Sequence, residues 1–308
     1  MLRISEFKDD HIHEAAELFK RSYDARCDTN PLIPKKEDLK NYVISKLKEK
    51  FGNPGVAALD DNELVGYMKE TGRAEEFMSK RTPFSLGLYS HSSVEQNKEK
   101  IYQKMYEGLS RTWIEEGFHS HVFSFWATDD ILQSTFFRLG FGMTHFELMR
   151  DLSRPEKPDI DVTIREIDNP NPIRKLDRDH HDFYPKAPLF WIPHGEYDPE
   201  HDFEGDIIAA FDGDEAIAYI HLTVNDAETP LLASEDIGRV AGAYADPKYR
   251  NKGVGTALLR EVVKWAKENH LKNLYVEGES ANIQGGNFWM KHFEPVVYTV
   301  RRCVDERV

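Results

Sequence analysis

The sequence contains one domain-sized segment twice. A shift of 152 positions places residues 208–220 over residues 56–68, with Tyr219 over Tyr67. The same shift keeps three further aromatic pairs in register without a gap: Trp113 with Trp265, Phe136 with Phe288, and Phe141 with Phe293. Unrelated segments do not keep aromatic residues in one register over such a span, so the repeat predicts two copies of one fold. The length of 308 residues agrees with two domains of about 150 residues each.

The boundary between the copies is predicted at residues 151–159, where charged residues and two prolines separate strand-like segments. We therefore expect one domain at residues 1–150, a linker at 151–159 and a second domain at 160–308. Strand and helix patterns alternate in each copy, so the expected fold class is α/β (α+β). Each copy is predicted to form a mixed, mostly antiparallel central sheet flanked by helices.

The second copy shows this order most clearly. Strands are expected at residues 162–167, 238–245 and 274–277, with a hairpin at 206–224 that turns at Gly213. A helix is expected at residues 253–269, because five apolar residues form one helical stripe: Val254, Ala257, Leu258, Val262 and Trp265. A short helix at 287–291 and a strand at 296–300 are expected to close this unit.

Charge and cysteine content limit the partners and the compartment. The chain has 54 acidic and 40 basic residues and a net charge of −14, so we expect no nucleic-acid or membrane partner, and cationic partners fit better. The beginning of the sequence does not resemble a leader peptide, and no apolar stretch of about 18 residues occurs. The two cysteines, Cys27 and Cys303, have no redox or zinc spacing, so we expect a cytoplasmic protein without a bound metal.

A glycine-containing turn before the predicted long helix suggests an anion site. Arg250, Gly253 and Gly255 lie between the strand at 238–245 and that helix. Glycines let an anion approach the backbone, and the unpaired amides of a helix's first turn donate to its oxygens. Glycines at such turns also serve backbone geometry or packing, so the pair alone is weak evidence.

The run PKYRNKGVGTALL resembles the coenzyme-A signature of the GNAT superfamily of N-acetyltransferases, and the resemblance extends over the whole second copy. It implies that acetyl-CoA is the cosubstrate. It also implies that the pyrophosphate is held by the turn residues Arg250, Asn251, Lys252, Gly253, Val254, Gly255 and Thr256. The pantetheine arm would pair with the backbone of the preceding strand at Ala243, Tyr244 and Ala245.

A second family motif is similar to the segment LYVEGESANIQGGNFWMKHF. The resemblance assigns Asn282 to the pantetheine and Trp289 to the sulfur. The family often has Tyr at the position of Trp289, and an indole N–H does not titrate, so thiolate protonation is left to solvent or to another group such as Tyr298. The resemblance also makes Glu277 the candidate general base, because some family members that acetylate protein N-termini use a Glu at a similar place. The chemistry requires a base, since an amine arrives as ammonium and must lose a proton before it attacks a thioester. The alternative is a solvated carboxylate at a strand end.

The segment at residues 177–203 is rich in histidines, carboxylates and aromatic residues, and includes His194. In the GNAT fold this region covers the acceptor site, so Tyr184 and Trp191, with Phe183 and Tyr197, are expected to enclose a cation beside Asp182 or Asp198. An ordered loop that completes the core is the alternative. Tyr219 and His221 on the hairpin are further candidate substrate residues. The spacing matches no standard zinc pattern.

The first copy lacks the same features. The shift places Lys98, Ile101 and Gln103 opposite Arg250, Gly253 and Gly255. Phe125 replaces Glu277, and Asp130 replaces Asn282. We expect this copy to be a degenerate GNAT-like domain that binds no coenzyme, or binds it far more weakly, and that has an architectural role.

The sequence thus predicts an N-acetyltransferase that transfers the acetyl group of acetyl-CoA directly to a primary amine of a small molecule or peptide in a ternary complex. A non-catalytic acyl-CoA-binding or sensing protein is the alternative, because Trp289 cannot act as an acid. A nucleotide-binding module is disfavoured, since no Walker lysine and Ser/Thr pair follows the glycines. The sequence does not identify the acceptor amine or the oligomeric state.

Overall fold

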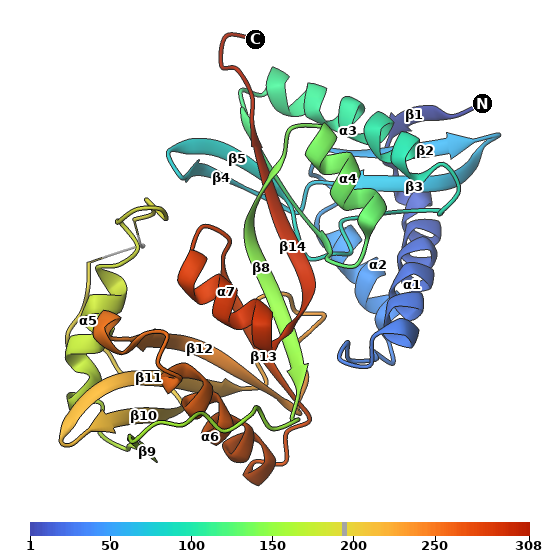
Figure 1. Ribbon diagram of the computed structural model, residues 1–308. Helices are drawn as coiled ribbons and strands as arrows, with labels where there is room; N and C mark the ends of the chain where they lie inside the picture. The colour runs from blue at the N-terminus through green and yellow to red at the C-terminus, as the bar shows by residue number, and fades with distance from the viewer. Residues whose placement is uncertain (193–195) are drawn as a thin grey trace. The chain divides into compact units, whose positions relative to one another are not determined.

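A computed structural model describes residues 1–192 and 196–308. The chain divides into two compact units: unit 1 contains Met1–Phe146 and Val296–Val308, and unit 2 contains Glu147–Pro295 (Figure 1). Among the described residues, every helix is too short or too polar to cross a membrane.

Unit 2 is built on one twisted sheet with strand order β8-β13-β12-β11-β10-β9. Its strands are β9 (Thr163–Glu166), β10 (Asp206–Asp212), β11 (Glu215–Val224), β12 (Ile237–Ala245), β13 (Asn273–Glu279) and the end of β8 (Gly142–Asp151). Its helices are α5 (Arg174–His181), α6 (Val254–Glu268) and α7 (Ile283–His292), with short 3-10 turns at Asn171–Ile173 and Pro247–Tyr249. β9 to β12 pair antiparallel, and β12 pairs parallel with β13. The predicted mixed, mostly antiparallel sheet flanked by helices is confirmed.

Helix α6 covers one face of this sheet. It begins after Gly253, whose φ of +90° suits a residue without a side chain. The predicted apolar stripe is buried, and the helix packs on β10 and β11 (Figure 1). Each fully buried side chain of Val or Leu size contributes about 1.5–3 kcal/mol, so this stripe is a major part of the core of unit 2. The Trp265 indole N–H donates to Asp206 Oδ2 at 2.8 Å, which fixes the helix against β10.

Unit 1 contains two sheets, ordered β1-β2-β3-β6 and β4-β5-β7-β14. Its strands are β1 (Arg3–Glu6), β2 (Gly55–Asp60), β3 (Glu63–Lys69), β4 (Gly72–Phe77), β5 (Lys80–Ser85), β6 (His91–Ser93), β7 (Ser120–Trp126) and β14 (Glu294–Cys303). Its helices are α1 (Ile12–Thr29), α2 (Leu39–Glu49), α3 (Lys98–Glu115) and α4 (Asp130–Arg138), with a 3-10 turn at Asp9–His11.

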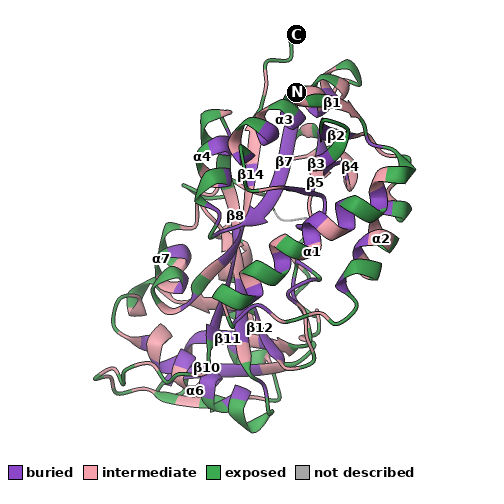
Figure 2. Cartoon of the chain, turned by 90° about the vertical axis from the view of Figure 1, so that its right-hand side faces the viewer, coloured by how far each residue is buried: buried purple, intermediate pink, exposed green. Residues whose placement is uncertain are grey.

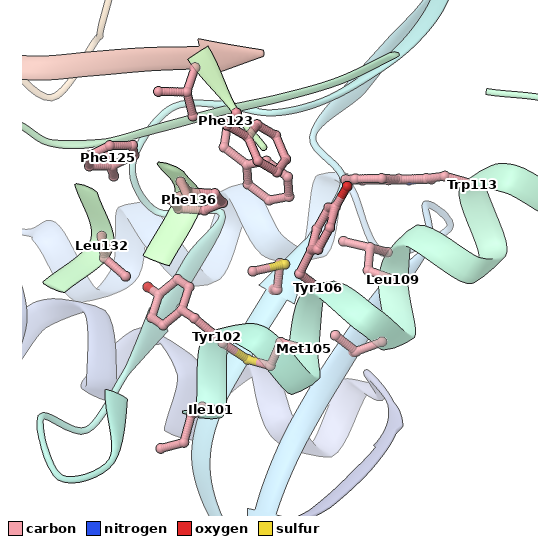
Figure 3. Packing of buried hydrophobic residues seen from close by; sticks show 14 of the residues in the cluster. Ile101, Tyr102, Met105, Tyr106, Leu109, Trp113, Phe123, Phe125, Leu132 and Phe136 are labelled. Atoms are coloured by element: carbon pink, nitrogen blue, oxygen red, sulfur yellow. The ribbon is translucent and has the colours of Figure 1, made fainter. Parts of the chain in front are cut away.

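The core of unit 1 is aromatic and lies between α3, α4 and β7. Every residue of β7 is buried (Figure 2). Phe136 stacks on Phe125 with ring centroids 5.2 Å apart and lies 5.0 Å from Phe123 (Figure 3). Tyr106 and Trp113 of α3 face the same cluster (Figure 3). Unit 1 therefore has a hydrophobic core of its own.

The last strands of the two copies are exchanged. The sequence predicts that residues 296–300 close the second copy, but β14 pairs antiparallel with β7 of unit 1, with Tyr298 opposite Phe125. The last strand of the first copy, β8, instead continues into unit 2, where it neighbours β13. Because both copies end in an equivalent strand, either strand can complete either sheet, as in domain swapping. Unit 2 therefore differs from the expected domain at 160–308: it lacks residues 296–308, and it includes residues 147–159.

Candidate active site

Two neighbouring strands of unit 2 diverge at the centre of the sheet. β12 and β13 pair from Ile237 opposite Asn273 to Val240 opposite Val276, and the pairing stops there. Beyond this point β12 stays with β11, and a bulge at residue 241 shifts the register between Val240 and Gly242. We call the unpaired ends, residues 241–245 of β12 and 277–279 of β13, the fork. Bulges of this kind often occur beside active sites.

One edge of the fork is free backbone. The Asp246 N–H donates to Ile217 O of β11 at 2.9 Å. Backbone groups alternate along a strand, so those of Tyr244 also face β11, whereas those of Ala243 and Ala245 face the fork. The Ala245 carbonyl accepts a hydrogen bond from Arg250 Nε at 2.9 Å. The remaining groups form an edge to which an extended amide-containing ligand can add like a strand.

The turn after β12 leads into the N-terminus of α6. The Ala257 N–H donates to Gly253 O, so the amides of Val254, Gly255 and Thr256 precede the first helical hydrogen bond. Among the residues that the structure describes, no side chain caps this helix. Three unpaired amides and the positive end of the helix dipole favour an anion at this position.

The glycines of the turn have packing roles of their own. A Cβ on Gly253 would lie 2.8 Å from Pro158 Cβ, and a Cβ on Gly255 would lie 3.1 Å from the Phe288 ring. The sequence motif attributes both glycines to the approach of a phosphate, but neighbouring atoms of the protein also leave little room for a Cβ at either position. The amides, rather than the missing side chains, therefore carry the argument for an anion.

Glu277 lies at the other edge of the fork in a hydrogen-bonded network. Its carboxylate contacts the Arg239 guanidinium, which also contacts Asp226. Its Oε2 lies 2.8 Å from the Tyr275 hydroxyl, which lies 2.7 Å from Glu147 Oε2. Glu277 is thus held in a fixed position and is 20% exposed, unlike a freely solvated carboxylate at a strand end.

Several carboxyl groups near the fork have raised pKa values. Burial raises the pKa of Glu147 to about 7. Burial also raises the pKa of Glu228 and Glu279, and the negative charge of Glu277 acts in the same direction on both. Carboxyl groups that titrate near neutral pH are suited to general acid–base catalysis.

A cavity of about 360 Å³ lies under the segment that connects β9 and β10. It is lined by Asp177, His180, His181, Tyr184, Glu196, Tyr197, Asp198 and His201. The hydroxyls of Tyr197 and Tyr219 donate to Asp177 at 2.8 and 3.1 Å. Three carboxylates and two tyrosines make this cavity suitable for a cationic group.

The cavity lies beside the fork. The ring of His180 is 5.6 Å from that of Tyr244 on β12. Tyr184 has a raised pKa, chiefly because it is buried and then because Glu279 and Glu277 are near. An amine in the cavity would therefore be close to the carboxylates of the fork.

The acetyltransferase (GNAT) family model matches residues 164–293. This segment of the chain therefore matches the GNAT family. The matched residues, here called the GNAT domain, contain the fork, the turn and the cavity.

Part of the chain is similar in sequence to a curated acetyltransferase. Streptothricin acetyltransferase A of Bacillus subtilis (strain 168) is 52% identical over 44 residues, which are 14% of this chain and 25% of the relative. The match thus spans a quarter of that relative's length.

Two solved structures share the fold. A GCN5-related N-acetyltransferase from Sphaerobacter thermophilus has a TM-score of 0.56 at 10% identity, with 98% of this chain and 95% of that chain covered. The GCN5-related glucosamine N-acetyltransferase region of a fungal multi-domain GH3 β-N-acetylglucosaminidase has a TM-score of 0.55 at 14% identity, with 98% and 38% covered. At these identities the likeness concerns the fold.

Two predicted coenzyme residues of the GNAT domain have local roles. Asn282 Oδ1 accepts a hydrogen bond from the Gly285 N–H at 3.0 Å and caps α7. Trp289 is buried, with its ring 4.8 Å from that of Phe288 and 5.5 Å from that of Phe293. Their contact with a coenzyme stays a prediction.

Tyr298, the alternative acid, lies in unit 1 and not in the GNAT domain. Its ring is 6.5 Å from that of Phe125 and packs against the core of unit 1. The exchange of β14 is the reason, because Tyr298 follows that strand into unit 1. Tyr298 and Glu277 therefore belong to different units.

The four candidate substrate residues have different positions. Tyr184 lines the cavity, and Trp191 packs edge-on against it with ring centroids 5.3 Å apart. The Tyr219 hydroxyl donates to Asp177, which lines the cavity. His221 Nε2 instead lies 2.8 Å from the Glu204 carbonyl oxygen. Asp182, which the sequence suggests as a partner for a cation, does not line the cavity, and Asp177 does. His194 lies outside the described residues.

No group of three or more His, Cys, Asp and Glu residues suited to a metal ion occurs in the part of the chain that the structure describes. The absence of a metal stays a prediction.

Unit 1 fills the positions that are open in the GNAT domain. His91 of β6 aligns with Ala243, and its ring nitrogens lie 2.9 Å from the Tyr102 hydroxyl and 3.0 Å from the Ser124 carbonyl oxygen of β7. Burial lowers the pKa of His91 to about 4, so the ring is neutral at pH 7. Helix α3 begins at Lys98, the equivalent of Arg250, so it starts one turn earlier than α6. The space between β6 and β7 is therefore occupied by protein.

We predict one acetyl-CoA site per chain. Calorimetric titration of the full chain should give a stoichiometry near one, because His91 and the earlier helix start occupy the equivalent space in unit 1. The full chain is needed, since cutting between the copies would separate β8 and β14 from the sheets that they complete. Two sites of similar affinity would contradict this prediction.

Proposed function

We propose that this chain is an acetyl-CoA-dependent N-acetyltransferase whose GNAT domain acetylates a primary amine of a small molecule or peptide. The observation that carries the proposal is the convergence of three features at one place. They are the free backbone edge of β12, the uncapped N-terminus of α6 and the carboxylates of β13. The family match supports acyl transfer in general.

The coenzyme would lie along the fork. The amides of Asn251 to Thr256 suit its pyrophosphate, and the backbone of Ala243 to Ala245 suits its amide-containing arm. Arg250 now contacts the Ala245 carbonyl and Gln284, so it would exchange these contacts for the coenzyme. When bound, acetyl-CoA supplies an activated thioester carbon.

The residues of the chain would prepare the amine. Glu277 accepts a proton from the ammonium form, directly or through water, and leaves a neutral nitrogen lone pair. The new C–N bond forms as the C–S bond breaks, the nitrogen loses its second proton to solvent, and the thiolate takes one proton from solvent, so one proton is released overall. Arg239 keeps Glu277 oriented, and unpaired amides at the fork stabilise the negative charge on the carbonyl oxygen.

The cavity favours a cationic acceptor. Asp177, Glu196 and Asp198 provide negative charge, and Tyr184 and Tyr197 provide aromatic surface. Two relatives are named for the acceptors streptothricin and glucosamine. We infer that this chain takes a small amine with at least one further cationic or polar group.

The direct test measures free thiol release by the full chain with acetyl-CoA and a panel of polyamines, aminoglycosides, amino sugars and peptides. Release that depends on the acceptor, with an acetylated product seen by mass spectrometry, is the expected result. A matched peptide with a blocked amine should give none.

A non-catalytic acyl-CoA-binding protein is the second candidate. It is favoured by Trp289, which has no titratable proton where the family often has Tyr, and by the ion pair that engages Glu277. Tight binding of acetyl-CoA without release for any acceptor would support this candidate and overturn the enzyme.

A further inference from the structure

Glu147, Tyr275 and Glu277 form a continuous line of oxygen atoms from the interior of unit 2 to the fork. Glu147 comes from β8, the strand that the first copy supplies, and is 2% exposed. Its Oε2 lies 2.7 Å from the Tyr275 hydroxyl, which in turn lies 2.8 Å from Glu277 Oε2. Both distances are those of hydrogen bonds.

The hydrogen bonds along this line of oxygen atoms require one proton more than the Tyr275 hydroxyl supplies. The Tyr275 hydroxyl has a single proton, and it already accepts a hydrogen bond from the Glu228 N–H at 3.1 Å. It can donate to only one of the two carboxylates. The other carboxyl must be protonated and donate to the tyrosine oxygen, because an ionised oxygen at this distance would face a lone pair.

Glu147 is the group that holds this proton. Arg239 forms an ion pair with Glu277. Among the described residues, Glu147 has no cation within ion-pair distance, and its polar contacts besides Tyr275 come from Thr229, whose hydroxyl and N–H donate at 2.6 and 3.2 Å. Burial raises the pKa of Glu147 to about 7, so its proton leaves and returns near neutral pH.

We propose that Glu147, Tyr275 and Glu277 are a proton relay that carries the proton of the acceptor amine away from the fork. The proposal rests on the proposed function. Glu277 takes the proton at the fork and donates it to the Tyr275 oxygen, while the Tyr275 proton passes to ionised Glu147. One proton moves, Glu277 is ionised again, and Glu147 becomes neutral. Glu147 contacts no substrate. It is a positioning residue that acts on the reaction through Tyr275 and Glu277.

The groups around Glu147 define the expected pH dependence. Tyr275 and Glu277 face it from β13, and Thr229 and Glu228 from the segment between β11 and β12. Arg239 of β12 acts through Glu277. The relay accepts a proton only when Glu147 is ionised, so turnover should rise with pH through the titration of this group.

The experiment compares four full-length proteins: wild type, Glu147→Gln, Tyr275→Phe and Thr229→Val. Infrared spectroscopy follows the C=O band of a protonated carboxyl with pH, and steady-state kinetics give kcat and KM over the same range. In the wild type, the band and the acid limb of kcat should share a midpoint near pH 7. In Glu147→Gln the component of the band that titrates with this midpoint should disappear, whereas components from other buried carboxyl groups, such as Glu228 and Glu279, should remain.

The variants separate the relay from a structural role. Glu147→Gln and Tyr275→Phe should both lose the acid limb and lower kcat at pH 8 by about tenfold, with KM for acetyl-CoA unchanged. Thr229→Val removes the hydroxyl hydrogen bond that lowers the pKa of Glu147 and keeps the backbone one, so band and limb should move together to higher pH.

An unchanged acid limb in Glu147→Gln, despite loss of that component of the band, would reduce Glu147 to a structural group and overturn the relay. Absence of that component in the wild type would overturn the placement of the proton. Absence of acetyl transfer by the wild type would instead overturn the proposed function, and the infrared titration would still report where the proton lies.

Discussion

Glu277→Gln is expected to lower kcat for acetyl transfer by about 10³-fold, because the glutamine amide cannot take the proton of the ammonium. The affinity for acetyl-CoA should change little, since the coenzyme is expected to bind the turn and β12 rather than the carboxylate. Arg239 retains Asp226 as an ionic partner in this variant. Steady-state kinetics with a saturating amine, together with calorimetry for the coenzyme, measure both quantities.

Glu279→Gln is the matched control. Glu279 lies two residues farther along β13, on the same face of the sheet, and burial raises its pKa. If Glu277 is the base, Glu279→Gln should keep kcat within a few-fold of wild type. A loss in Glu279→Gln that equals or exceeds that in Glu277→Gln would transfer the role of base to Glu279.

Glu147→Gln is expected to change how stability depends on pH. The pKa of Glu147 is raised by burial from 4.5 to about 7 in the folded chain, so the folded state binds more protons than the unfolded state between these values. The free energy of unfolding of the wild type therefore falls as pH rises through this window, by about 3 kcal/mol at 1.36 kcal/mol per pKa unit. The variant lacks this contribution.

Denaturant titrations of both proteins at pH 5 and pH 8 measure the effect. The variant should gain about 3 kcal/mol relative to wild type between pH 5 and pH 8, whatever its stability at either pH. Other buried carboxyl groups contribute equally to both proteins and cancel. Parallel pH profiles would show that Glu147 is ionised throughout.

Local patterns in the sequence predict most of the GNAT domain. The repeat, the hairpin at Gly213 and the apolar stripe of α6 depend on residues close together in the chain, so they can be recognised without the fold. Two other signals of this kind were missed. Asn282 is a typical helix N-cap, and it places the start of α7 at Ile283 rather than at residue 287.

The second missed signal is in the segment over the acceptor cavity. Asp177, His180, His181 and Tyr184 are spaced as one face of a helix, and all four line the cavity. Helical spacing, rather than composition alone, would have selected Asp177 in place of Asp182.

The exchange of β8 and β14 could not be predicted from sequence patterns. Both strands end a copy of the same fold, and nothing local determines which sheet each completes. Glu147 and Tyr298 therefore could not be assigned to their units from sequence. The relay depends on Glu147, so it could be found only once the partner of β13 was known.

The central claim is that the amides at the start of α6 bind the anionic part of acetyl-CoA. Calorimetric titration of wild type, Thr256→Glu and Thr256→Gln tests it most directly. Both variants lose the same hydroxyl, which lies 3.5 Å from His292 Nε2. A carboxylate in the first turn stabilises a helix, so Thr256→Glu should unfold at a temperature no lower than Thr256→Gln.

The account predicts that Thr256→Gln binds acetyl-CoA within about twofold of wild type, whereas Thr256→Glu binds at least tenfold more weakly, about 1.4 kcal/mol, because its charge repels the pyrophosphate. Equal affinity in all three proteins, or no heat of binding in the wild type, would contradict it.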